Sequence, residues 1–313
     1  MASILEPQIL LSTKRHEIVD CSYWGSVFLA NSKGIYKQIG YDKTKICFMR
    51  SLAKPIQTSI IADCNIINDY KLEDKEIAIF CASHSGSRHH IKILKNIIKK
   101  HKLKVSDLEL VCAKPLDLRG FNGRKTKLHN NCSAKHIMMM LVCKYLGFDS
   151  RNYTNENHPL QKLILKKQNE LSNYNSTILT YDGCSTPLWG LPFEKIIESY
   201  YSLFHNRKYD IIIKSIINNP YTYGGHDRLD TEIIQLSKKR LFSKVGAGGF
   251  IIVYNFSKDE ILLIKLTQNN NAIRKLITLD ILNKLGWVRS EVSQWEYNQK
   301  KQKVAKYCYE FQI

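Results

Sequence analysis

Patterns typical of β-strands lie near the two ends of the chain, and one lies between them. Apolar residues 26–30 and 35–39 flank the turn residues Asn31 to Gly34, a combination that predicts a β-hairpin. In chain order, the strand patterns fall within about 15–50, 74–82, 244–254 and 260–265. We therefore expect a sheet formed by the strands of about 15–50 and 244–265.

Helical periodicity, with apolar residues every three or four positions, dominates the region from about 87 to 240. The predicted helices are 55–67, 87–114, 134–146, 159–170, 211–217, 230–237 and 272–285, and a polar tail follows. We find no internal repeat and no low-complexity linker. The pattern predicts an α/β (α+β) fold in which residues 1–313 form a single unit, a sheet from both ends with a helical inset.

Composition excludes several classes of protein. The chain has 313 residues, of which 44% are hydrophobic and 24% charged, values typical of a globular protein with a sizeable core. Its net charge of +19 comes from 47 Lys and Arg against 28 Asp and Glu. The excess is mostly lysine, is spread along the chain and accompanies no nucleic-acid motif. We interpret it as a compositional bias, with a functional basic surface as the alternative, and expect no nucleic-acid partner.

The cysteines and the apolar runs indicate a compartment. Nine cysteines, an odd number, do not suggest a disulfide framework and fit a reducing environment. No stretch approaches 18 uncharged apolar residues, and the N-terminal residues 1–11 lack the basic region of a signal peptide. We expect a cytoplasmic protein without a membrane partner.

Serine and lysine occur in three short motifs whose order suits hydrolysis. Ser51 and Lys54 are one helical turn apart, Ser83 follows the predicted strand 74–82, and Lys244 begins a Lys-Val-Gly sequence on a late strand. A lysine of lowered pKa can take the proton of a serine hydroxyl. The same order occurs in penicillin-binding proteins and β-lactamases. Taken singly, each motif also fits a capping serine or a solvated lysine.

Two further segments are rich in reactive side chains. Cys132 and Lys135 lie three residues apart at a helix start, and Cys184 could meet them from a distant loop. Two thiolates and a neutral amine or imidazole would suit zinc. The alternatives are buried structural cysteines, or a thiol nucleophile paired with His129 or His136.

From about Arg15 to Tyr254 the chain resembles the Rhizobium-type L-asparaginases, which are unrelated to the threonine-dependent bacterial enzymes. The matching residues are Arg50–Gln57, Ala82–Gly86, Leu128–His136, Asp149, His158–Gln161, Asp182–Pro187, Arg228–Thr231 and Lys244–Ala247. The His-Asn-Asn-Cys and Asp-Gly-Cys-Ser sequences are the most specific of these.

The resemblance implies a serine β-lactamase-like fold, hydrolysis of L-asparagine to L-aspartate and ammonia, and a homodimer. It pairs Ser51 with Lys54 and Ser83 with Lys244, and we favour Ser51 as the nucleophile. It implies one zinc ion per chain, held by Cys132, Lys135 and Cys184. It also implies a substrate pocket shaped by Arg50, Asn131, His136 and Asp182.

Two departures from the family pattern affect the expected substrate. Ser87 and Gly248 stand where the family usually has glutamate. The alternatives are therefore a related amidase acting on another small amide, such as glutamine, or a catalytically weak homologue kept for binding. Retention of both serines and both lysines favours the asparaginase.

Overall fold

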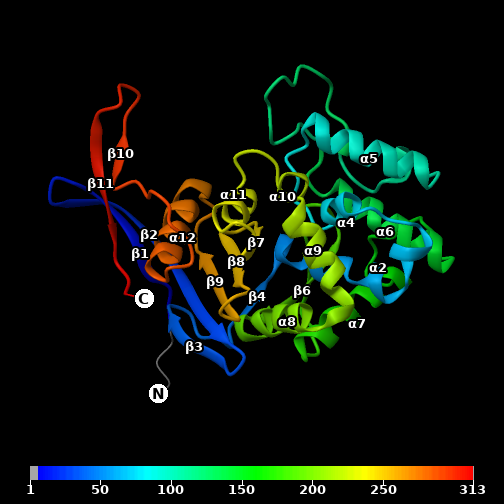
Figure 1. Ribbon diagram of the computed structural model, residues 1–313, viewed down its shortest axis with the longest axis horizontal. Helices are drawn as coiled ribbons and strands as arrows, with labels where there is room; N and C mark the ends of the chain where they lie inside the picture. The colour runs from blue at the N-terminus through cyan, green and yellow to red at the C-terminus, as the bar shows by residue number, and fades with distance from the viewer. Residues whose placement is uncertain (1–5, 313) are drawn as a thin grey trace.

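The computed structural model describes residues 6–312, and its main feature is an eight-stranded antiparallel sheet (Figure 1). The strands run in the order β10-β11-β1-β2-β9-β8-β7, and β3 pairs with β2. Their bounds are β1 Gln8–Arg15, β2 Ile18–Asn31, β3 Gly34–Ile39, β7 Leu241–Gly246, β8 Phe250–Asn255, β9 Glu260–Leu266, β10 Trp295–Tyr297 and β11 Lys303–Tyr309. The predicted sheet from both ends of the chain, and with it the mixed α/β class, is confirmed.

Helices fill the middle of the chain, as predicted. The α-helices are α1 Ala53–Thr58, α2 Ile60–Asp63, α3 Ile66–Asp69, α4 Asp74–Phe80, α5 Arg88–Lys100, α6 Ser133–Leu146, α7 Pro159–Ser172, α8 Phe193–His205, α9 Asp210–Asn218, α10 Pro220–Tyr223, α11 Leu229–Leu236 and α12 Asn271–Lys284. The 3₁₀ helices are η1 Arg50–Leu52, η2 Val105–Asp107, η3 Lys127–His129 and η4 Arg207–Tyr209. Residues 6–312 contain no helix that is both long and apolar enough to cross a membrane.

The part of the large sheet formed by β7, β8, β9 and the second half of β2 is covered on both faces, and successive side chains of these strands enter opposite cores. In β2, Val27 and Leu29 belong to a core that includes residues of α11 and α12. Phe28 and Ala30 belong to a second core, shared with η1, α1, α4 and α6 to α9. Figure 1 shows α12 beside the sheet and the α4–α9 helices on its other side. The residues between these helices and β7, the strand that contains Lys244, are therefore shielded from water.

A small three-stranded sheet lies within the helical region. Its order is β4-β6-β5, with bounds β4 Ile46–Phe48, β5 Leu179–Tyr181 and β6 Pro187–Pro192. The antiparallel pairing of β6 with both neighbours brings the segment after β4 near the loop that joins β5 to β6. These two segments carry Arg50 and Asp182.

The prediction of a strand at 74–82 is wrong. Residues Asp74–Phe80 form helix α4, which begins with a capping box between Glu73 and Glu76. Residues Ile77 to Phe80 are all fully buried, so the helix has no polar face to reveal its period. Ser83 therefore follows a helix and not a strand.

Other boundaries also differ from the predictions. The pattern at 244–254 is two strands, β7 and β8, joined by a turn in which Gly248 and Gly249 have positive φ. The helix predicted at 87–114 ends at Lys100, and the predicted helix at 55–67 is divided among α1, α2 and α3. The polar tail contains β10 and β11, which pair with each other, and β11 also pairs with the unpredicted strand β1. Pairing, not an apolar pattern, orders this end of the chain.

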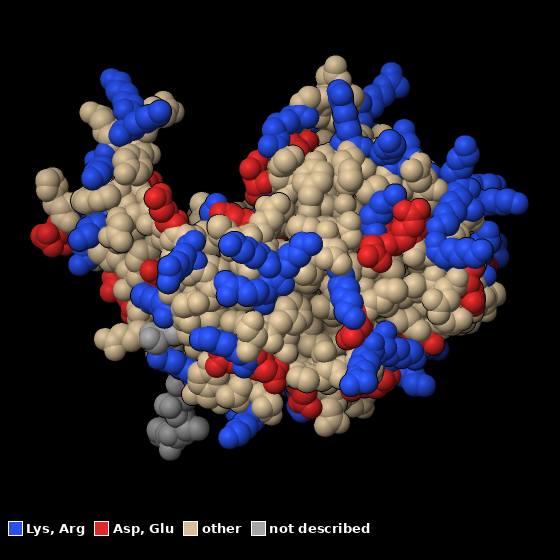
Figure 2. All heavy atoms as spheres, viewed as in Figure 1, with Lys and Arg blue, Asp and Glu red and all other residues tan. Residues whose placement is uncertain are grey.

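The basic residues are dispersed. Figure 2 shows Lys and Arg side chains over most of the visible face, with Asp and Glu between many of them. This distribution agrees with a bias in composition.

Candidate active site

The predicted serines and lysines come from four separate elements. Ser51 lies in η1 and Lys54 in the first turn of α1, directly after β4. Ser83 lies in the segment between α4 and α5, and Lys244 is the fourth residue of β7. Packing of the helical region on β7 buries all four side chains, with Ser51 the most accessible at 9%. Arg50, the residue before Ser51, has a left-handed backbone with φ of 52°.

Ser83 is the residue that the two lysines share. Lys54 Nζ donates to Ser83 Oγ at 3.1 Å, and Lys244 Nζ donates to the same oxygen at 3.3 Å. Lys54 Nζ also donates to the backbone oxygens of Ala82, at 2.8 Å, and Asn131, at 3.1 Å. Lys54 thus makes three donated hydrogen bonds, the number that a protonated ammonium can make.

Lys244 lies in a different electrostatic environment. Its side chain is fully buried, and this loss of hydration lowers its pKa from 10.5 to about 8. The carboxylate of Asp230, 3.9 Å from Lys244 Nζ, opposes the shift, while the positive charges of Lys54 and Arg228 add to it. Lys244 is therefore suited to accept a proton near neutral pH.

Ser51 is near Lys54 in sequence but makes no hydrogen bond to it. Among the described residues, no hydrogen bond to the Ser51 hydroxyl is found, and all three donors of Lys54 point to other acceptors. The structure thus pairs Ser83 with Lys244, as expected, and places Lys54 on Ser83 as well. Ser51 is the most accessible of the four side chains, so a substrate can reach its hydroxyl most easily.

The second cluster brings together the predicted metal ligands. Cys132 precedes the first residue of α6, Lys135 lies in the first turn of that helix, and Cys184 lies in the β5–β6 loop. Lys135 Nζ is 3.1 Å from Cys184 Sγ and 2.7 Å from Thr186 Oγ1. The two sulfurs and a carboxylate oxygen of Asp182 all lie within 4.8 Å of one another. Residues distant in sequence therefore meet as predicted.

The two thiols have opposite pKa shifts. A hydrogen bond between them lowers the pKa of Cys184 and raises that of Cys132, and burial adds to the rise at Cys132. Positive charge on Lys135 further favours the Cys184 thiolate. Burial disfavours charge on Lys135, but the two thiols and Asp182 outweigh it and raise its pKa. Without a metal, the arrangement is a thiolate–ammonium pair.

These donors fit a zinc ion. Two thiols and a carboxylate within one small volume are a suitable donor set for zinc. His136 Nε2, one turn along α6 from Cys132, is buried and has no hydrogen-bond partner among residues 6–312, whereas its Nδ1 is 2.8 Å from the Tyr153 hydroxyl. Burial lowers the pKa of His136, which keeps its ring neutral and able to ligate.

The residues predicted to shape the pocket connect the two clusters. Arg50 Nε donates to Asp182 Oδ1 at 2.7 Å, an ion pair that joins the segments after β4 and β5. Asn131 accepts from Lys54 through its backbone oxygen, and its side-chain Oδ1 is 3.6 Å from Cys132 Sγ. All four predicted pocket residues are thus adjacent to a predicted serine, lysine or cysteine.

Three residues of this region carried no assigned role in the sequence. Asp230 is fully buried beside Lys244 and also accepts from the backbone N–H of Val245. Thr186 holds Lys135, and Tyr153 holds His136. Asp230 and Thr186 lie inside matched sequence blocks, which is the signal that could have singled them out. Tyr153 has no such signal.

The fold and site define a mixed α/β protein in which two serines and two lysines lie buried in one cluster. The sequence matches the family described as L-asparaginase II over residues 11–308, and the chain belongs to that family. Membership of this family supports an enzyme of the asparaginase type, which is a class of amidohydrolase. A search of curated proteins finds no match.

Two solved structures that are similar to this chain have low sequence identity to it. A β-lactamase from Mycobacterium bovis is 10% identical with a TM-score of 0.43, covering 85% of this chain and 95% of that chain. A penicillin-binding protein from Bacillus halodurans is 10% identical with a TM-score of 0.39, covering 82% of this chain and 96% of that chain. The description of the fold therefore rests on the strands and helices themselves.

Proposed function

We propose that this protein hydrolyses the side-chain amide of L-asparagine to L-aspartate and ammonia. Its family supports the class of reaction. The observation that carries the mechanism is the bonding of one hydroxyl, Ser83 Oγ, to two buried lysines, together with the burial that lowers the pKa of Lys244 to about 8.

Proton transfer along the hydrogen-bonded series Lys244, Ser83 and Lys54 can activate Ser51, the more accessible serine. When Lys244 is neutral, Ser83 can pass its proton to Lys244 and take one from Lys54. Lys54 is then neutral and can accept the proton of Ser51 after a side-chain rotation. Ser51 Oγ forms a bond to the amide carbon, the C–N bond breaks, and the nitrogen leaves as ammonia with the proton from Lys54. Water then gives a proton to Lys54 and attacks the ester carbon, the bond from that carbon to Ser51 Oγ breaks, and Ser51 Oγ takes the proton back from Lys54 as L-aspartate leaves.

The second cluster would position the substrate. We propose that Cys132, Lys135 and Cys184 hold a zinc ion, with a carboxylate oxygen of Asp182 within 4.8 Å of both sulfurs. Such an ion would supply a fixed positive charge that orients the substrate. Lys135 must lose its proton to ligate, and a bound cation favours that loss. Polar groups for the substrate would come from Arg50, Asn131, His136 and Asp182.

Ammonia release by the purified protein tests the function. L-asparagine and L-glutamine are supplied separately, with and without added zinc, and S51A serves as the matched control. We expect release from asparagine, increased by zinc and absent in S51A. Release from glutamine alone would retain the mechanism and reject the substrate. A folded protein that releases ammonia from neither amide would refute the proposal.

A further inference from the structure

A cavity of about 530 Å³ lies outside the serine–lysine and cysteine clusters. One wall is helix α5, and the other is the 115–123 loop, which stands out beside α5 at the top of Figure 1. Gly86 and Ser87 also line it, so it adjoins the segment that carries Ser83. Its size is within the range of small-molecule sites.

Positive side chains along one face of α5 reach this cavity. Arg88, Lys92 and Lys95 are spaced four and three residues apart, and all three line it. None of them has a carboxylate partner within residues 6–312; Arg88 donates only to the backbone oxygen of Gly120, at 3.3 Å. Lys92 and Lys95 make no hydrogen bond or ion pair within that same range. The cavity thus has three cations without counter-charges.

This arrangement is unfavourable to the helix itself. Like charges three or four residues apart repel each other. The first turn of α5 contains no acidic residue and begins with Arg88, although a helix N-terminus favours negative charge. An anion in the cavity would offset the repulsion among the three cations and would supply the negative charge that the N-terminus of α5 lacks. It would face the free N–H groups of that N-terminus and the three cations together.

The wall opposite α5 adds an aromatic ring and an amide. Phe121 lies edge-on to the His129 ring, with centroids 5.1 Å apart, and both residues line the cavity with Asn122, while Asn96 adds an amide from α5. Arg119 is held by Asp117 at 2.8 Å and adds little free charge. The wall therefore offers apolar and hydrogen-bonding surface beside the cations.

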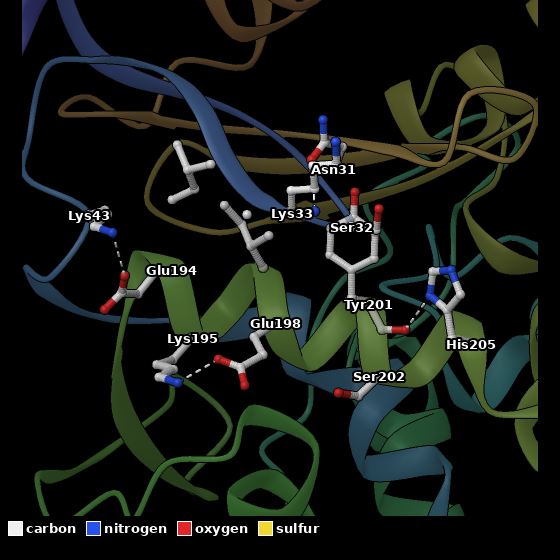
Figure 3. Close-up of a pocket in the computed structure, with 13 residues that line it drawn as sticks. Asn31, Ser32, Lys33, Lys43, Glu194, Lys195, Glu198, Tyr201, Ser202 and His205 are labelled. Carbon is white, nitrogen blue, oxygen red and sulfur yellow. Dashed lines mark hydrogen bonds and ion pairs between the residues drawn. The ribbon is translucent and has the colours of Figure 1, made fainter.

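A larger cavity, of about 650 Å³, provides a contrast (Figure 3). It lies between the β2–β3 turn and α8, and it contains two carboxylates, each paired with a lysine. Lys43 binds Glu194 at 3.2 Å, and Lys195 binds Glu198, while Lys33 has no ion pair among residues 6–312. Two of its three lysines are thus paired with carboxylates, whereas neither lysine on the cavity face of α5 is.

We propose that the cavity between α5 and the 115–123 loop binds a small molecule that carries a diphosphate group. Arg88, Lys92, Lys95 and the N-terminus of α5 would bind the phosphoryl oxygens. Inorganic pyrophosphate and a nucleoside diphosphate share this chemistry, and Phe121 would add contact area only for the second.

Calorimetric titration of the purified full-length protein with each ligand tests the site. The variant K92Q/K95Q removes two charges from the cavity, and K99Q/K104Q removes two exposed charges that do not line it. Since charged hydrogen bonds contribute about 1.5–3 kcal/mol each, we expect the first variant to bind at least about tenfold more weakly. The control should change affinity less than about twofold.

Three outcomes decide the question. Binding of either ligand that is weakened selectively by K92Q/K95Q, in a variant with unchanged circular dichroism, supports the site. Tighter binding of the nucleoside diphosphate that is lost in F121A identifies it as the source of the diphosphate. Binding of neither ligand, or equal weakening in both double variants, would overturn the proposal, because equal weakening reflects only the net charge of the protein.

Discussion

Replacement of Asp230 by asparagine tests whether Lys244 must lose its proton before the reaction can start. With a pKa of about 8, Lys244 is neutral in about one molecule in a hundred at pH 6 and in half of the molecules at pH 8. We therefore expect kcat/KM for asparagine to rise about tenfold per pH unit below pH 8 and to level off above it.

The carboxylate of Asp230 stabilises the charged form of Lys244. Removal of that carboxylate should therefore move the rising limb of the pH profile of kcat/KM to lower pH. The two charged groups are 3.9 Å apart and fully buried. At an effective dielectric constant of about 20, their attraction is about 4 kcal/mol, which sets an upper limit of about three pH units on the shift. Relaxation of the site reduces it, and we expect D230N to move the limb by at least about one pH unit.

The measurement is a pH profile of ammonia release for the wild-type protein, D230N and D280N. Asp280 also pairs with a lysine, Lys284 at 3.0 Å, but on α12, so D280N is the matched control and should leave the limb in place. An asparagine at 230 can still accept from Val245 N–H, and circular dichroism checks that D230N is folded. An unchanged limb in folded D230N would refute the assignment of Lys244.

Two further substitutions test the remaining groups. S83A removes the hydroxyl that links the lysines and should reduce kcat about 10²- to 10⁴-fold while leaving KM for asparagine nearly constant, as measured by initial rates; a rate near that of the wild type would exclude the relay. C184A should lower bound zinc and raise the apparent KM more than it changes the folding transition, with C143A, a buried cysteine outside the cluster, as the control. Equal zinc in C184A and the wild type by elemental analysis would contradict the metal site.

The sheet was predictable to the extent that its strands carry an apolar period. The second half of β2 and most of β9 are buried apolar runs, and the turn residues between β2 and β3 marked the hairpin, so these patterns were evident. Helix α4 was mistaken for a strand because both a buried helix and a buried strand read as a short apolar run. Its capping box starts with Glu73 and not with the usual Ser or Thr, so the chain carried no clear sign of a helix start. β10 and β11 carry no apolar pattern, because they are ordered by pairing with each other and, for β11, with β1.

The site was predictable in membership but not in connectivity. Resemblance to a family identified the serines, lysines and cysteines, and the structure brings them into two adjoining clusters. The resemblance could not indicate that Lys54 donates to Ser83 and not to Ser51, since that depends on where α1 places the Lys54 side chain relative to the 81–87 segment. Nor could it show that Asp230, from α11, accompanies Lys244 into the interior.

The two positions that depart from the family pattern lie apart from the serines and lysines. Ser87 Oγ is 2.7 Å from His90 Nδ1 and 3.3 Å from the Tyr221 hydroxyl, so it bonds to α5 and α10. Gly248 lies in the β7–β8 turn with φ of 73°, where glycine is favoured, and its backbone oxygen accepts from Lys265. Neither change removes a hydrogen bond from Ser83, Lys54 or Lys244. We therefore expect loss of the two glutamates to affect which amide the proposed hydrolase recognises, and the hydrogen bonds of both lysines to Ser83 favour that hydrolase over a homologue kept only for binding.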